Sequence, residues 1–106
     1  MNKFALLFVV ALSAPLAAQA LAAGADELKF NPEKLCAWQA ANNSMDAAEC
    51  GKLEDDAKAQ ISALEGAADD ARKSACVDEA KGFSADSGFA SYTVYAGCLK
   101  DGPGSL

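Results

Sequence analysis

The sequence predicts an all-α fold, a small disulfide-stapled helical bundle of about four helices arranged as two helical hairpins. Apolar residues recur at intervals of three and four between recognisable helix starts, which is the spacing of one helix face. The chain of 106 residues has four cysteines and no histidine. It also begins with an export pattern, and an even number of cysteines in a short exported chain is typical of a disulfide framework.

The N-terminus has the order of an export signal. A short positive start precedes the apolar run Phe4–Leu12, and Pro15 and small residues follow it. Two cleavage positions fit, after Ala20 or after Ala22, and we favour Ala22. The alternative is a retained membrane anchor, which needs about 20 consecutive apolar residues. Because Pro15 and a glutamine interrupt the run, we interpret residues 1–22 as a signal peptide.

After cleavage we expect a flexible N-terminal segment at 23–30, one disulfide-stapled helical domain at 31–101 and a loose tail at 102–106. The mature chain keeps all fifteen acidic residues and loses one of the nine basic residues. It has no basic cluster, so we expect no contact with nucleic acid, and none with membrane after cleavage. A basic partner is compatible with this charge without being implied by it. The sequence does not set the oligomeric state.

The first two predicted helices have clear starts. Asn31 is a good cap and Pro32 suits the first helical position, so a helix should run to the Asn-Asn turn at Asn43. Asp46 caps the next helix, which we expect Gly66 to end. One stripe holds the apolar positions of this second helix: Cys50, Leu53, Ala57, Ile61 and Leu64. Its outer face should carry Glu54 and Lys58, four residues apart in the favoured order.

The last two elements are less uniform. A helix with an alanine-rich buried face is expected from about Asp69 to Lys81, closed by Gly82. Residues 82–88 should form a loop. In Phe89–Lys100 the aromatic and β-branched residues favour a strand, whereas the apolar spacing favours a helix. We predict a helix, because a lone strand would have nothing to pair with.

The cysteines, Cys36, Cys50, Cys76 and Cys98, can form three pairings. In an antiparallel helical hairpin, facing residues lie equally far from the turn. The first two cysteines are equidistant from position 43 in the Asn-Asn turn, and the last two from position 87 in the predicted loop. Pairing Cys50 with Cys76 would require a slip of several ångströms past the Gly66 turn. The spacing therefore favours Cys36–Cys50 and Cys76–Cys98.

Candidate sites are few. Trp38, Tyr92 and Tyr95 are candidate partner contacts, although each also suits the core. We predict no metal site, because the cysteines are too far apart for zinc ligands and Glu54–Asp56 lack a calcium-loop pattern. A solvated helix face is the expected role of those acids, and a surface or helix-capping ion pair is the expected role of Arg72. With no histidine available as a base, we predict no catalytic residue and no cofactor.

The chain resembles known families over about residues 36–99. The motifs are Cys50 followed by Glu54 and Ala57, Arg72 four residues before Cys76, and a closing Ser-Tyr … Cys-Leu. This order resembles small exported four-cysteine helical proteins of α-proteobacteria whose function is not established. It is similar, more distantly, to the LprI-type lysozyme-inhibitor domain. The resemblance implies a disulfide-linked array of helical hairpins. Because the Cys50–Cys76 span is shorter and a Leu-Asn-x-x-Tyr signature is missing, no inhibitory residue carries over.

These observations predict a periplasmic or secreted, non-enzymatic protein. Its expected role is a binding or interaction module for an envelope or secreted protein. The alternatives are a structural or stress-related, chaperone-like envelope protein and, from the resemblance, a lysozyme inhibitor. An enzyme acting through a pair of acids ranks below these, because no pair of acids is singled out by its spacing.

Export can be tested by mass. We expect the protein recovered from the periplasm or the medium to begin at Ala23, because the signal ends at Ala22. Intact-mass spectrometry of the non-reduced protein measures this directly. A mass that still includes residues 1–22 would contradict the prediction.

Overall fold

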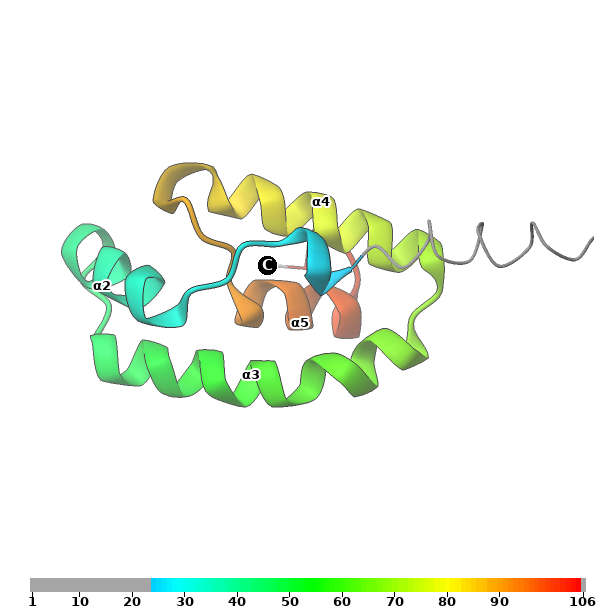
Figure 1. Ribbon diagram of the computed structural model, residues 1–106, viewed down its shortest axis with the longest axis horizontal. Helices are drawn as coiled ribbons and strands as arrows, with labels where there is room; N and C mark the ends of the chain where they lie inside the picture. The colour runs from blue at the N-terminus through cyan, green and yellow to red at the C-terminus, as the bar shows by residue number, and fades with distance from the viewer. Residues whose placement is uncertain (1–23, 106) are drawn as a thin grey trace, which may run out of the picture.

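A computed structural model describes residues 24–105, and in this range the chain is helical (Figure 1). Its elements are η1 (Ala25–Glu27), α2 (Pro32–Asn43), α3 (Ala47–Ala67), α4 (Asp70–Ser87) and α5 (Tyr92–Asp101). The predicted all-α bundle with four α-helices is confirmed. The expected signal peptide, residues 1–22, lies outside the described residues. Within those residues, no helix is long and apolar enough to cross a bilayer.

Each α-helix begins at a side-chain cap. Asn31, Asp46, Asp69 and Ser91 each accept a hydrogen bond from the backbone N–H three residues later, at 2.7–3.2 Å. Such a cap satisfies one of the N–H groups that the first turn leaves without a partner. The predicted starts at Asn31 and Asp46 are confirmed.

The predicted helix ends at Gly66 and Gly82 are wrong. Helix α3 continues to Ala67, and α4 continues through the expected loop at 82–88 to Ser87. A glycine inside a helix costs only about 1 kcal/mol relative to alanine, so packing can outweigh it. Helix α4 ends instead at Gly88, whose φ of 88° is the left-handed conformation that glycine adopts without strain.

Two disulfides staple the helices as predicted. Cys36–Cys50 joins α2 to α3 and Cys76–Cys98 joins α4 to α5, with Cα–Cα distances of 5.6 and 5.5 Å. The alanine-rich buried face expected on the third helix is only partly right, because Ala80 is fully buried whereas Ala71 is exposed. The two hairpins meet through α5, which packs against both α3 and α4.

The helix predicted for Phe89–Lys100 is confirmed from Tyr92 onward, whereas Ala90 forms an isolated β-bridge with Phe30. Helix α5 supplies much of the core. Its residues Tyr95, Cys98 and Leu99 are buried in one cluster with Ile61 of α3 and Val77 of α4. The spacing 95, 98, 99 is one helix face, and that face meets two neighbours at once. No residue of α2 belongs to this cluster; α2 packs on α3 and buries Leu35 and Cys36.

The two terminal segments lie against the bundle where the structure describes them. We expected residues 23–30 to be flexible, yet the backbone N–H of Ala90 donates to Lys29 O at 2.8 Å and the Phe30 ring stacks on Tyr92 at 3.9 Å. In the expected loose tail, the N–H of Gly104 donates to Glu79 Oε1 at 2.6 Å.

Because α2 lies outside the main core, we expect its disulfide to stabilise mainly α2 itself. Replacing Cys36 and Cys50 with alanine should lower the free energy of unfolding by about 3 kcal/mol. It should also raise amide hydrogen exchange chiefly in α2, because α2 lies outside the main core. Exchange mass spectrometry checks this against the Cys76→Ala/Cys98→Ala protein, in which α4 and α5 should lose protection. Equal loss of protection in all helices of the first variant would contradict the two-hairpin description.

Candidate functional site

Glu54 occupies an interior position that we expected to be solvent-exposed. Glu54 is only 3% exposed, whereas its neighbours Asp55 and Asp56 are exposed. The predicted pair between Glu54 and Lys58 does not form; the Lys58 ammonium lies 5.7 Å from the centroid of the Tyr92 ring. The assignment of all three acids to a solvated helix face is therefore wrong for Glu54.

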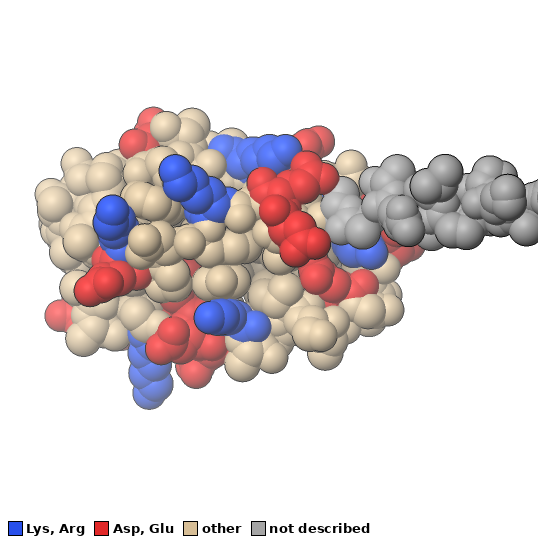
Figure 2. All heavy atoms as spheres, viewed as in Figure 1, with Lys and Arg blue, Asp and Glu red and all other residues tan. Residues whose placement is uncertain are grey.

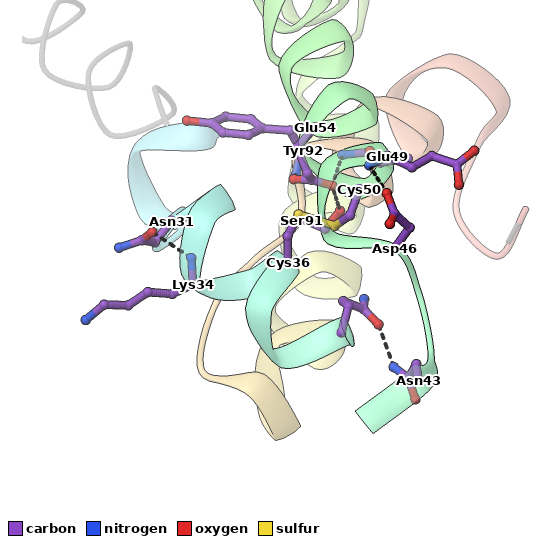
Figure 3. Close-up of a disulfide and its surroundings, with 12 residues drawn as sticks. Asn31, Lys34, Cys36, Asn43, Asp46, Glu49, Cys50, Glu54, Ser91 and Tyr92 are labelled. Atoms are coloured by element: carbon purple, nitrogen blue, oxygen red, sulfur yellow. Dashed lines mark hydrogen bonds between the residues drawn. A yellow bond between two sulfur atoms is a disulfide. The ribbon is translucent and has the colours of Figure 1, made fainter. Parts of the chain in front are cut away.

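The Glu54 carboxylate caps the first turn of α5 (Figure 3). Its Oε1 accepts the N–H of Tyr92 at 2.7 Å, and its Oε2 accepts the Ser91 hydroxyl at 2.5 Å and the N–H of Thr93 at 3.3 Å. The Ser91 oxygen in turn accepts the N–H of Val94. A negative side chain is favoured here, because the N–H groups and the helix dipole present positive charge. The buried acid thereby fixes α5 on α3.

A second carboxylate, Glu65, binds α5 through Tyr95, the fourth residue of the helix. Its Oε2 accepts the Tyr95 hydroxyl at 2.7 Å and the backbone N–H of Ala25 at 2.9 Å. Burial raises the pKa of the Tyr95 phenol well above its ordinary value, and the hydrogen bond to Glu65 and its charge raise it further. Tyr95 is fully buried.

The three candidate partner contacts differ in how far the structure buries them. Tyr95 is a core residue and is unavailable to a partner. Tyr92 is half-buried and stacked on Phe30, and Trp38 is half-buried on α2. Arg72 donates to the carbonyl oxygen of Leu99 at 3.0 Å, so it holds the end of α5 through a hydrogen bond to the backbone instead of the expected ion pair.

An apolar groove lies beside Glu54, with a volume of about 240 Å³. It is lined by Leu35, Gln39, Met45, Cys50, Leu53, Glu54, Phe83, Ser91, Thr93 and Val94. These residues come from all four α-helices and the α2–α3 turn. The large apolar side chains that are exposed in the described part of the chain, Met45, Leu53 and Phe83, all belong to this groove, at 39, 48 and 37% exposure.

Leu53 departs from its predicted place in the buried stripe. The stripe that the structure buries on α3 is Cys50, Glu54, Ala57 and Ile61, which has the same three- and four-residue spacing as the predicted one. Leu53 instead stands at the groove edge. Helical spacing alone fits Leu53 and Glu54 equally well. The apolar side chain made Leu53 the expected buried residue, and that expectation is wrong.

The buried polar groups of the groove are engaged within the protein. The oxygens of Glu54 are already engaged by donors of α5, and the Ser91 hydroxyl is engaged by Glu54. Over residues 24–105, no three acidic, histidine or cysteine side chains are grouped to hold a metal ion. The groove offers a mainly apolar surface, and its polar lining residues are Gln39, Glu54, Ser91 and Thr93.

Comparisons with known proteins add no template. No protein-family model, curated protein or solved structure matches the chain. The function is therefore argued from the groove and its surroundings.

The capping role of Glu54 can be measured by substitution. Glu54→Gln should lower the free energy of unfolding by about 2 kcal/mol, because an amide NH₂ would face donors that the carboxylate now accepts. Asp55→Asn removes the same charge at the neighbouring exposed position and should change stability by less than about 0.5 kcal/mol. Urea denaturation of both variants provides the comparison. Equal effects would show that charge, and not capping, matters.

Proposed function

We propose that this chain is an exported, non-enzymatic binding module that holds an apolar segment of a protein partner in the groove. The observation that carries the proposal is the gathering of Met45, Leu53 and Phe83 at one place. Exposed apolar side chains that cluster, rather than scatter, mark interaction surfaces.

The size of the groove supports a protein partner. A volume of about 240 Å³ is below the ~300–1,000 Å³ of most small-molecule pockets. It suits one or two apolar side chains that protrude from a larger surface. Anchors of this kind supply most of the binding energy at protein interfaces.

Export is supported by the signal-like N-terminus and by the two disulfides, which persist in oxidising compartments. Nucleic acid is an unsuitable partner, because the chain carries a net charge of −6. Figure 2 shows acidic and basic side chains interspersed on one face, with no basic cluster on it.

A chaperone-like role is the alternative that the same groove supports, and the family resemblance adds lysozyme inhibition. The three functions differ in what is bound. A binding module holds one partner, a chaperone-like protein holds many unrelated clients, and an inhibitor holds lysozyme. An apolar groove of about 240 Å³ favours one defined segment, because a holdase needs apolar surface for many sequences.

The proposal is tested by capture with oxidised protein comprising residues 23–106, from a periplasmic extract. We expect one main protein to be retained, and Leu53→Gln and Phe83→Gln each to weaken its binding about tenfold. The matched control is Ala63→Gln, which places the same side chain at an exposed position of α3. Circular dichroism establishes that all variants are folded.

Two results would contradict the proposal. One is capture of the same protein, at the same affinity, by the Leu53→Gln/Phe83→Gln protein. The other is retention of no protein at saturating bait. Retention of many unrelated proteins would indicate the chaperone-like alternative, and retention of lysozyme alone would indicate the inhibitor.

A further inference from the structure

We infer that the segment held in the groove is basic and amphipathic, with an apolar anchor flanked by lysine or arginine. This inference rests on the proposed function and names the chemistry of the partner. It follows from the charges that border the two exposed apolar edges of the groove, Leu53 on α3 and Phe83 on α4.

The two edges carry the same arrangement of acids. Leu53 has Glu49 four residues before it and Asp56 three residues after it. Phe83 has Glu79 and Asp86 at the same two offsets. Positions three and four apart are neighbours on a helix surface. Each apolar edge therefore has an acid one turn before it and another one turn after it.

These acids lie on the solvent side of each edge. Cys50 lies three residues before Leu53 and Ala57 four residues after it, and both are buried. Ala80, three residues before Phe83, is also buried. Leu53 thus separates the interior from an outer acidic row, and Phe83 does the same on α4. Glu49, Asp56 and Asp86 are exposed, while Glu79 is half-buried and accepts the N–H of Gly104.

Little positive charge balances this rim. No lysine or arginine occupies an offset of three or four from Leu53 or Phe83. Lys52 lies three residues after Glu49 and four before Asp56, so it is the one basic residue of α3 that offsets part of the rim charge, and α4 has no equivalent at those offsets from Glu79 or Asp86. The ion pairs found among the described residues, Lys73–Asp70 and Lys81–Glu27, involve none of the four rim acids.

The helix dipoles add to the same sign. Helices α2 and α4 both end beside the groove, since Met45 follows α2 and Phe83 lies just before the last turn of α4. Neither helix has a basic residue in its last turn. Their C-terminal carbonyl groups contribute partial negative charge. Two helix N-termini lie at the groove. That of α5 is matched by Glu54, and that of α3 is capped by Asp46 and has Glu49 in its first turn.

An apolar cleft with a negative rim selects among partners. A rim of one sign speeds the encounter with the opposite charge and opposes like charge, and salt weakens both effects. Acidic apolar segments and anionic lipid surfaces are therefore disfavoured, although their apolar parts would fit the groove. A segment that places basic side chains one turn from its anchor matches both rims.

The test uses three synthetic helical peptides with the same leucine and phenylalanine anchors, differing only in flanking lysine, glutamine or glutamate. Binding to oxidised protein comprising residues 23–106 is followed by NMR titration of groove resonances, which detects weak binding. We expect the lysine peptide to bind at least tenfold more tightly than the glutamate peptide at about 0.01 M salt. This preference should shrink at about 0.15 M salt.

Matched variants separate the rim from overall charge. Glu49→Gln/Asp56→Asn/Asp86→Asn should abolish the preference for lysine. Glu33→Gln/Asp55→Asn/Asp101→Asn removes the same charge from exposed positions that do not line the groove and should keep the preference. Leu53→Gln should weaken all three peptides.

The outcomes distinguish the two proposals. If the three peptides bind equally and all depend on Leu53, the groove binds apolar segments and the inference about charge is wrong. If the two triple variants behave alike, the rim is not the source of selectivity, and the inference is also wrong. If no peptide perturbs the groove resonances, both the inference and the proposed function are overturned.

Discussion

The contact between Glu54 and the first turn of α5 determines the arrangement of the other helices. Burying a carboxylate is unfavourable unless donors replace its water, and here Ser91, Tyr92 and Thr93 supply them. Because α5 packs against both α3 and α4, the same contact sets how the two hairpins meet. It also sets the floor of the groove, where Glu54 and Ser91 lie side by side. One acid thus connects the stability of the bundle to its binding surface.

Features decided by local chemistry were predictable from the sequence. Asn31 and Asp46 bond to N–H groups three residues away, so the helix starts could be read directly. The disulfides were predicted from equal spacing about positions 43 and 87. Each position is the last residue of a helix, although 87 was expected to lie within a longer loop. Helix ends were harder to predict, because the penalty for Gly82 inside a helix is small. Helix α4 ends where Gly88 adopts a positive φ. Glycine permits this conformation at position 82 as well as at position 88, so the residue type alone does not locate the end of the helix.

The site was less predictable because its contacts are distant in sequence. The donors to Glu54 lie 37 to 39 residues further along the chain, so a polar residue on a helix with apolar neighbours looked solvent-exposed. The groove gathers Met45, Leu53 and Phe83 from three elements, and no single segment contains its pattern. A usable signal was present in the spacing of α3. Glu54 fits the buried stripe of Cys50, Ala57 and Ile61 as well as Leu53 does.

The groove is also an oxidation-dependent surface. Leu35 and Gln39 of α2 form one wall, Leu53 of α3 forms another, and the Cys36–Cys50 disulfide joins the two helices beside them. In a reducing compartment the walls have no covalent link, so affinity for any occupant is coupled to disulfide formation. By reciprocity, an occupant that needs both walls favours the oxidised state by the same free energy.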